Sequence, residues 1–389
     1  MHVIFRESHG LDEADTPQDL RQTPADLVVL SLSDSDLGAF ASGWRRAKAT
    51  AGADMPSLRL ANLVALKHPL SVDTYIDNTL HAARGILIRL IGGVPYWPYG
   101  LQSVAALARE KGIALAILPA DGRQDTQLDE LSTLPISTLR RLGDLCATGG
   151  PVAAHAALAQ LALAAGLYAT PVLGDKALPI YGFWSPKQGL TSPLTTETTE
   201  TTEHAAPRLA ITFYRSFLSA GDTSPIQALF DAFEQRGFDV YGLFIPSLKA
   251  PEAAKWLAQQ LHDLAPDAIV NATSFSGKGK DGTSPLDVAG VPVFQVALAT
   301  STRSAWAEAD RGLSPSDLAM HVVLPEVDGR LFSGVVSFKE PDARDPDLQY
   351  ARYAHNAHPT RLAATVDKVA AWVTLAKKPP ADKRIAMIL

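Results

Sequence analysis

Short apolar runs alternate with helix-like segments along most of the chain, and this alternation restricts the fold more than any other feature. Runs that are apolar at nearly every position predict strands covered on both faces. Between them, apolar residues at three- and four-residue spacing predict helices with one buried face, as in Thr74–Ala83 and Leu101–Lys111. The predicted strands of the first part are Val3–Phe5, Leu27–Leu32, Leu58–Leu63, Ile86–Ile91 and Ile113–Leu118.

The strand signal stops after Asp121, and two helices are expected to close a first domain at residues 1–190. They are predicted at Ile136–Cys146 and Val152–Ala165. The tract Thr191–Pro207 consists largely of Thr, Glu and Pro, which offer little to bury, so it predicts a linker or surface loop.

The alternation resumes beyond this tract and predicts a second α/β domain at residues 208–378. The expected elements are strands Leu209–Phe213, Val240–Ile245, Ala268–Asn271 and Val291–Leu298, and helices Pro225–Arg236, Pro251–Leu264 and roughly Tyr350–Lys377. The predicted fold class is therefore α/β, with two successive domains of mostly parallel sheet flanked by helices and joined by a low-complexity linker.

Chain length and composition narrow the class of protein further. A chain of 389 residues exceeds what one hydrophobic core usually supports. A net charge of -6 without a basic patch argues against nucleic-acid binding. The sequence shows no secretory signal and no membrane-spanning stretch, so no membrane association is expected. A single cysteine excludes an intrachain disulfide and fits a cytoplasmic protein.

The last residues, 379–389, predict the first strand of a further region. The apolar run RIAMIL follows Pro379 and Pro380, and the sequence stops there. We therefore expect the chain to be truncated, or naturally split, before another domain.

The segment Val291–Arg330 carries the most specific pattern in the chain. It is expected to join a buried strand, a polar turn at Thr300–Arg303, a helical segment that contains Trp306, and a second strand before Arg330. Loops after the carboxyl ends of parallel strands are where open α/β sheets place ligands.

Six ordered blocks, this segment included, resemble one family. The other five are QTPADLVVLSLSDSDL (Gln22–Leu37), LRLANLVALKHPLSVDTYID (Leu58–Asp77), GGVPYWPYG (Gly92–Gly100), ITFYRSFLSAGDTSPIQALFDAFEQRGFDVYGLFIPSLK (Ile211–Lys249) and IVNATSFS (Ile269–Ser276). Together they resemble the amino-terminal portion of the large subunit of aerobic, ATP-dependent cobaltochelatase of cobalamin biosynthesis, a family related to the magnesium chelatase large subunit.

The resemblance implies a large subunit that inserts Co²⁺, as a substrate, into the corrin precursor hydrogenobyrinic acid a,c-diamide. It implies that ATP is hydrolysed by partners, an AAA+ ATPase subunit and an integrin-like subunit. No tightly bound cofactor is expected on this chain, and the fragment alone is expected to be inactive. The alternatives are a non-catalytic module that binds the tetrapyrrole or docks partners, a magnesium chelatase homologue that acts on a porphyrin, and a protein that binds an unrelated small molecule in an interdomain cleft.

Two loops of the first domain carry candidate substrate-binding residues. His68 follows a predicted strand and could contact a metal or a tetrapyrrole side chain, or it could simply orient the turn. Tyr96 and Trp97 follow Gly92 and Gly93, so their rings could stack on a macrocycle or pack onto the next helix.

Two arginines of the second domain are further candidates. Arg215 and Arg303 each follow a predicted strand, and they would meet if those strands were neighbours. Two guanidinium groups would suit corrin carboxylates, whereas the structural alternative is pairing with an acidic residue such as Asp222, Glu308 or Asp310.

The remaining candidates are weaker. Ser276 opens the loop SGKGK, which lacks the spacing of an ATP-binding P-loop. His355 and His358 stand three apart, but Pro359 disfavours a helix at His358 and places the pair in a helix-entry turn. No metal site is predicted, and catalytic residues cannot be assigned.

Overall fold

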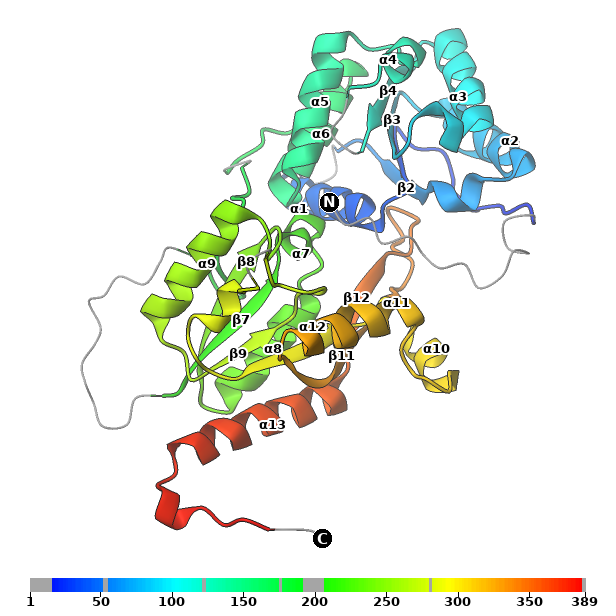
Figure 1. Ribbon diagram of the computed structural model, residues 1–389. Coiled ribbons are helices and arrows are strands. Elements are labelled where there is room, and N and C mark those ends of the chain that lie inside the picture. The colour runs from blue at the N-terminus through cyan, green and yellow to red at the C-terminus, as the bar shows by residue number, and fades with distance from the viewer. Residues whose placement is uncertain are drawn as a thin grey trace. The chain divides into compact units, whose positions relative to one another are not determined.

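The computed structural model describes residues 16–51, 55–120, 124–174, 177–191, 206–279 and 282–386 (Figure 1). The chain divides into two compact units. Unit 1 comprises Met1–Leu178, Leu218–Asp222 and Pro341–Ala354, and unit 2 comprises Pro179–Phe217, Thr223–Glu340 and His355–Leu389. Each unit contains one sheet, so the α/β fold class is confirmed.

The sheet of unit 1 has four parallel strands in the order β2-β1-β3-β4. The strands are β1 (Leu27–Ser31), β2 (Leu58–Asn62), β3 (Gly85–Leu90) and β4 (Ala114–Pro119). All four coincide with predicted strands to within one or two residues. Val29 lies opposite Leu60 of β2 on one side and Leu87 of β3 on the other, which gives the register of these three strands.

Helices cover both faces of this sheet, which explains why β1 and β3 are buried at every position and are mostly apolar. Val28 and Leu30 face a core that includes residues of α2 and α3, whereas Leu27 and Val29 face α1, α5 and α6 (Figure 1). The helices are α1 (Asp34–Ala51), α2 (Pro69–Asn78), α3 (Pro98–Lys111), α4 (Thr126–Leu131), α5 (Ile136–Thr148) and α6 (Pro151–Ala164), with 3-10 turns at Leu63–Leu66, Leu80–Ala82 and Val94–Tyr96.

A segment from late in the chain, residues 341–354, belongs to unit 1. Leu348 is completely buried in the core that contains α1 and α6. The Arg59 guanidinium donates to the backbone oxygen of Asp347 at 2.7 Å, and the side-chain amide of Gln22 donates to the backbone oxygen of Gln349 at 2.9 Å. Unit 1 is therefore completed by residues that follow most of unit 2 in sequence.

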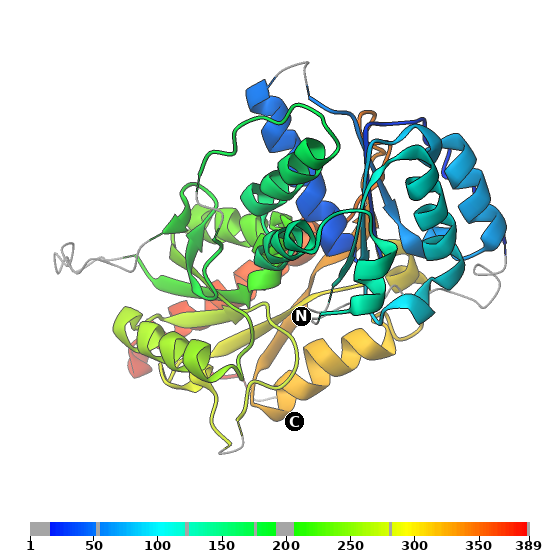
Figure 2. The same cartoon turned by 90° about the horizontal axis from the view of Figure 1, so that it is seen from above.

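The sheet of unit 2 has eight strands in the order β12-β11-β10-β9-β7-β8-β5-β6. The central pairs are parallel, whereas β5 runs antiparallel to β8 and β6. Figure 2 shows this sheet from above, from the green strands β5 and β7 to the orange strand β11. The strands are β5 (Gly182–Ser185), β6 (Gly189–Thr191), β7 (Arg208–Tyr214), β8 (Asp239–Ile245), β9 (Ala268–Asn271), β10 (Val293–Leu298), β11 (Leu331–Pro341) and β12 (Tyr353–Ala357).

Helices also pack on the sheet of unit 2. Leu257 and Leu261 of α9 belong to a core with β7 and β8, while ring contacts Trp184–Phe230 and Phe294–Trp372 attach α8 and α13 to the sheet. The helices are α7 (Arg215–Ala220), α8 (Ser224–Gln235), α9 (Pro251–Leu264), α10 (Arg303–Glu308), α11 (Pro315–Leu318), a π-helix (Ala319–Val323), α12 (Leu324–Val327) and α13 (Pro359–Lys377), with 3-10 turns at Pro285–Asp287 and Pro380–Asp382.

One predicted element is wrong, and two predicted helices have different bounds. The second strand expected before Arg330 is a run of short helices, because Leu318 and Val322 are four residues apart and face the core beside β10 and β11 together. The long helix expected from Tyr350 begins at Pro359, since Tyr353–Ala357 forms β12. The helix expected at Thr74–Ala83 runs instead from Pro69 to Asn78, because His68 caps it and Pro69 occupies its first position.

Strands β5, β6 and β11 were not predicted. Their burial is incomplete, and β11 carries Ser333, Gly334 and Ser337 in its centre. Val3–Phe5, residues 192–205 of the predicted linker and residues 387–389 of the predicted last strand lie outside the described residues. Residues 384–386 form neither helix nor strand. Within the described residues, no helix combines the length and apolar character needed to span a bilayer.

Candidate functional site

A buried polar network in unit 2 links β7, β9 and β10 at the level where β9 ends. Asn271 ends β9, and its side-chain oxygen accepts from the hydroxyls of Thr212, at 2.7 Å, and Thr273, at 2.9 Å. Its amide nitrogen donates to Gln295 at 2.7 Å, and the Gln295 amide donates to the backbone oxygen of Thr273 at 2.7 Å. A buried network whose partners are satisfied fixes the positions of its members. It therefore provides a rigid base for the loops at this edge.

Asp317 lies on α11 and is completely buried beside Thr300, which closely follows β10. Its carboxylate accepts from the backbone nitrogen of Thr300 at 3.0 Å and from the Thr300 hydroxyl at 3.0 and 3.1 Å. Sequence reasoning missed Asp317, because an Asp after a Ser and a Pro has the pattern of an ordinary helix cap, which Ser314 does provide.

His321 lies beside this carboxylate in the π-helix. Its Nε2 is 3.8 Å from Asp317 Oδ1, and its Nδ1 is buried without a hydrogen-bond partner among the described residues. Burial lowers the pKa of His321 to about 4, against the opposing effect of the Asp317 carboxylate and with a smaller lowering effect of His355. The imidazole is therefore neutral near pH 7, and its unprotonated nitrogen can accept a hydrogen bond.

The two histidines of the predicted pair, His355 and His358, lie on β12 and directly after it. His355 is a buried residue of β12 and packs edge-on against Phe217, with ring centroids 5.6 Å apart. The prediction of a helix-entry turn is therefore wrong for His355. It is right for His358, which is the N-cap position of α13 and packs edge-on against Phe338.

Arg215 and Arg303 do not come from neighbouring strands. Arg215 follows β7 and Arg303 follows β10, and β9 lies between these two strands. The Arg215 Nε donates to the backbone oxygen of Pro179 at 2.8 Å. Arg303 is exposed at the start of α10. The condition for the two arginines to meet, neighbouring strands, is not fulfilled, because β9 lies between β7 and β10.

A third arginine, Arg361, lies against the helix that Arg303 begins. Its guanidinium carbon is 4.6 Å from the ring centroid of Trp306, which is three residues after Arg303. Its Nε donates to the backbone oxygen of Val335 at 2.9 Å. No sequence motif marks Arg361, and only the packing of α13 against β11 brings it to Trp306.

The Ser276 loop is tied to a buried carboxylate. The Ser276 hydroxyl donates to Asp328 Oδ1 at 2.9 Å, and the Gly277 nitrogen donates to Oδ2 at 2.6 Å. This carboxylate occupies the donors that a phosphate would need, and Lys280 lies outside the described residues. Asp328 therefore holds the Ser276 loop in place, and the loop is not arranged as a phosphate site.

The candidates in unit 1 lie away from any shared polar centre. His68 caps α2, since its Nδ1 accepts from the Leu70 nitrogen at 3.1 Å. Trp97 is buried in the core and donates from its indole nitrogen to the Leu66 oxygen at 2.8 Å. Tyr96 is 58% exposed, and its ring lies against Gly92, where a Cβ would approach ring atoms to 2.1 Å. Of the two aromatic candidates, Tyr96 is the one that offers a substantially exposed ring.

Unit 1 also contains a buried ion pair that sequence reasoning missed. Arg89, at the end of β3, donates to Asp36 Oδ1 at 2.8 Å, and Ser31 donates to the other oxygen at 3.0 Å. Burial lowers the pKa of Arg89 and is the largest single effect, but Asp36 and Cys146 together outweigh it, so the pKa is raised. The nearby Cys146 thiol has a pKa raised by burial to about 11, which leaves it protonated at neutral pH.

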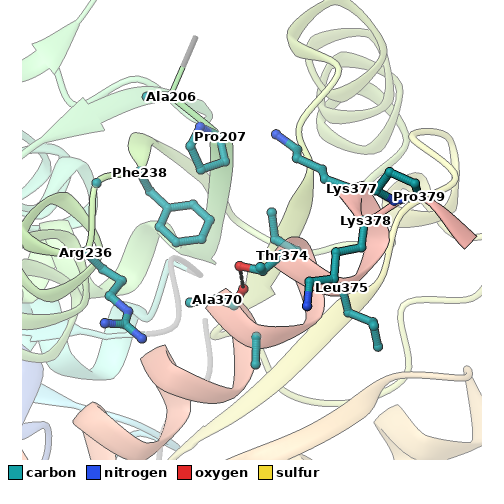
Figure 3. A pocket seen from close by; sticks show the side chains of 13 residues that line it. Ala206, Pro207, Arg236, Phe238, Ala370, Thr374, Leu375, Lys377, Lys378 and Pro379 are labelled. Atoms are coloured by element: carbon teal, nitrogen blue, oxygen red, sulfur yellow. Dashed lines mark hydrogen bonds between the residues drawn. The ribbon is translucent and has the colours of Figure 1, made fainter. Parts of the chain in front are cut away.

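A shallow groove of about 1160 Å³ lies between α13 and the turn that joins α8 to β8 (Figure 3). Figure 3 shows Arg236 and Phe238 on one side and Thr374, Lys377 and Lys378 on the other. Arg236 pairs with Asp367 at 3.2 Å and Lys377 with Asp267 at 2.9 Å. Because these cations already have carboxylate partners, the groove is a poor anion site. Across the described residues, no group of three or more His, Cys, Asp or Glu side chains could hold a metal ion.

Comparison with known proteins identifies the family. Residues 151–389 match the family model described as CobN/Magnesium Chelatase. Two aerobic cobaltochelatase subunits named CobN, from a Sinorhizobium species and from Pseudomonas aeruginosa, are each 32% identical over the whole chain. The chain spans 31% of the length of each.

Two further matches agree with this assignment. A magnesium-chelatase subunit from Cereibacter sphaeroides is 30% identical, but the match covers 37% of the chain and 13% of that protein. The solved catalytic subunit of cobaltochelatase from Mycobacterium tuberculosis superimposes with a TM-score of 0.67 and 26% identity, covering 92% of this chain and 28% of that one. The family match over more than half the chain, the relatives that cover all of it and the shared fold together show that this chain belongs to the CobN/magnesium chelatase family.

Proposed function

We propose that this chain is the amino-terminal part of the large subunit of an ATP-dependent cobaltochelatase. The observation that carries this proposal is coverage: the cobaltochelatase relatives match 100% of the chain, whereas two magnesium-chelatase relatives match 37% and 52%. The proposed reaction inserts Co²⁺ into hydrogenobyrinic acid a,c-diamide in the cytoplasm during aerobic cobalamin biosynthesis.

The chemistry requires an enzyme that holds a macrocycle, removes water from the metal and accepts the protons displaced from the ring nitrogens. The described residues of this chain suit the first task best, because Arg303 and Arg361 can hold an anionic side chain of the macrocycle. The described part of the chain offers no group of metal ligands, which supports the proposal that these residues alone do not chelate cobalt.

ATP hydrolysis is proposed to take place in partner subunits, an AAA+ ATPase and an integrin-like subunit. The one Gly-rich basic loop considered, at Ser276, lacks the P-loop spacing and is bonded to Asp328. Co²⁺ is then a substrate of the assembled enzyme, and no cofactor bound tightly to this chain is required.

The proposal is tested by comparing the native polypeptide that carries this sequence with the chain 1–389 alone. Each is mixed with the two partner subunits, MgATP, Co²⁺ and the corrin precursor, and metal insertion is followed by the change in visible absorption. We expect insertion by the native polypeptide, dependent on ATP, and none by residues 1–389 alone. Insertion by the shorter chain would contradict its proposed inactivity, and absence of insertion by both would contradict the function.

Magnesium chelation of a porphyrin is the second candidate, because magnesium-chelatase subunits match part of the chain. The same assay with Mg²⁺ and a porphyrin decides between the two. A non-catalytic tetrapyrrole-binding or partner-docking role for this region is distinguished separately: binding of the precursor or of a partner would survive in residues 1–389 while turnover would not.

A further inference from the structure

The side chains of Arg303, Trp306, His358 and Arg361 form a cationic surface in unit 2, which we call the Trp306 surface. Arg303 and Trp306 are three residues apart on α10, so they lie on one side of that helix. Arg361 contributes from the first turn of α13, and His358 is the N-cap position of the same helix. The Trp306 surface therefore joins the ends of two helices that are far apart in sequence.

Arg361 is held in place by contacts that leave its two terminal nitrogens available. Its Nε donates to the Val335 oxygen at 2.9 Å, and its guanidinium plane lies over Trp306 with the carbon 4.6 Å from the ring centroid. No carboxylate among the described residues pairs with Arg361 or with the Arg303 side chain. A guanidinium fixed through Nε presents its terminal N–H groups as a fork, the geometry that binds a carboxylate through two parallel hydrogen bonds.

The Trp306 ring that contacts Arg361 is itself held in place by other aromatic side chains. Trp306 packs on Phe338 with ring centroids 5.3 Å apart, and Phe338 packs edge-on against His358 at 5.9 Å. Phe338 is almost completely buried, so the stack is anchored in the core. A cation that is already positioned on a fixed ring loses little freedom when it binds an anion, which favours affinity.

A carboxylate lies at the start of α10, where Glu340 Oε1 accepts from the Arg303 backbone nitrogen at 2.5 Å, but the surroundings of α13 favour a negative ligand. The Nδ1 atom of His358 is buried and has no hydrogen-bond partner among the described residues, and α13 has no side-chain N-cap. Elsewhere in unit 2, by contrast, Arg236 and Arg330 are each paired with a carboxylate. The Trp306 surface thus keeps two guanidinium groups without the acidic partners that neutralise other arginines.

We propose that the Trp306 surface is a receptor for a carboxylate side chain of the tetrapyrrole substrate, with Arg361 as the forked donor and Arg303 as the second cation. This inference rests on the proposed function, which supplies a macrocycle that carries free carboxylates. It replaces the predicted pair of Arg215 and Arg303 with a pair drawn from α10 and α13.

The first experiment uses arginine-selective modification by phenylglyoxal, read by peptide mass spectrometry on the native polypeptide. A tetrapyrrole carboxylic acid at saturation is expected to slow modification of Arg361 and Arg303 by about fivefold or more, corresponding to about 1 kcal/mol of protection. Its methyl ester and ATP are expected to give no protection, and Arg236, at the groove of Figure 3, serves as an internal control that reacts equally in all samples. Equal rates for Arg361 with and without the acid would overturn the receptor, as would equal protection by the ester. Protection by ATP would assign the surface to a phosphate ligand instead.

The second experiment measures dissociation constants by quenching of tryptophan emission. Arg361→Ala is expected to weaken binding of the acid about 10- to 100-fold, the usual effect of losing hydrogen bonds to a charged group, and to change binding of the ester less than about twofold. Arg361→Lys should lie between the two because an ammonium cannot form the fork. The charge-matched control Arg236→Ala should bind the acid as the parent does, and unchanged acid binding by Arg361→Ala would refute the proposal.

The two proposals fail in different ways. If Arg361→Ala and Arg303→Ala bind the acid and insert cobalt as the parent does, the receptor is wrong and the proposed function stands. If the acid protects Arg361 but cobalt is never inserted with the partner subunits present, the receptor stands and the proposed function is wrong.

Discussion

At the scale of single residues, the most consequential interactions are those that place charge away from water. The Arg89 side chain is 5% exposed and the Asp36 side chain 19% exposed, so their attraction is little screened by solvent. In contrast, Lys187 and Glu234 form a pair at 2.7 Å in which the lysine side chain is 74% exposed. Breaking the buried pair is therefore expected to change the free energy of unfolding more than breaking the exposed pair.

Asp36→Ala is expected to destabilise unit 1 by about 3–5 kcal/mol, because it leaves the Arg89 guanidinium buried without its partner. Glu234→Ala is the matched control and should change the free energy of unfolding by less than about 1 kcal/mol. Urea unfolding followed by circular dichroism measures both. A loss for Asp36→Ala no larger than that of the control would contradict the structural importance of the buried pair.

His321 predicts a pH dependence of stability. Its pKa is lowered from 6.5 to about 4 in the folded protein, so between these values the unfolded chain binds the proton and the folded chain does not. Stability therefore falls as the pH drops from about 6.5, and the loss levels off near pH 4. Between pH 7 and pH 5 the contribution is about 2 kcal/mol.

His321→Asn is expected to remove most of that pH dependence, as measured by urea unfolding at the two pH values. The exposed His262, at 72% side-chain exposure, provides the control His262→Asn, which should leave the dependence unchanged. An unaltered slope in His321→Asn would show that another group titrates in this range.

At the scale of elements, close helix packing in unit 1 depends on small residues. Gly43 of α1 faces α6, and a Cβ at Gly43 would approach the backbone nitrogen of His155 to 2.6 Å. Gly143 of α5 has no atom within 4 Å of the corresponding position. Both glycines lie within helices, so they differ chiefly in whether another helix covers them.

Gly43→Ala is expected to destabilise the protein by about 1–3 kcal/mol, since the backbone of α6 must move to admit a methyl group. Gly143→Ala should instead stabilise it by about 0.5–1 kcal/mol through helix propensity. Thermal or urea unfolding of the two variants gives opposite signs if α1 and α6 pack as described. A stabilising Gly43→Ala would contradict this packing.

The elements also show how far sequence reasoning extends. Strands such as Leu27–Ser31 and Ala268–Asn271 were predictable because both of their faces are buried, which makes them continuously apolar. Strand β11 was not, because Ser333, Gly334 and Ser337 interrupt its pattern and only its neighbours bury it. The residues of the candidate site were likewise predictable only where a local sequence pattern marks them. Arg303 was found because it closely follows a recognisable strand, whereas the contacts of Asp317 with His321 and of Arg361 with Trp306 arise from packing that leaves no local pattern.

At the scale of the whole chain, the two units are interleaved in sequence. Unit 1 takes its last segment from residues 341–354, and unit 2 continues with residues 355–389. The chain therefore returns from unit 2 to unit 1 twice, at residues 218–222 and again at residues 341–354. A mutation late in the sequence is consequently able to destabilise the sheet that forms from the first 120 residues.

Leu348→Ala is expected to destabilise unit 1 by about 2–5 kcal/mol, because Leu348 is completely buried in its core. Hydrogen exchange with mass spectrometry should show faster exchange in peptides from β1 and β3. Leu375→Ala is the control, since that side chain is 50% exposed, and it should leave these peptides unchanged. Unchanged protection of β1 in Leu348→Ala would separate residues 341–354 from unit 1.

The interleaving has a consequence for synthesis on the ribosome. Residues 1–178 emerge first, but the segment that supplies Leu348 emerges only after 162 further residues, 179–340, have been translated. At about 5–20 residues per second, that delay is roughly 8–32 s. During this interval the nascent chain exposes the apolar surface that Leu348 later covers, so molecular chaperones have a defined window in which to bind it.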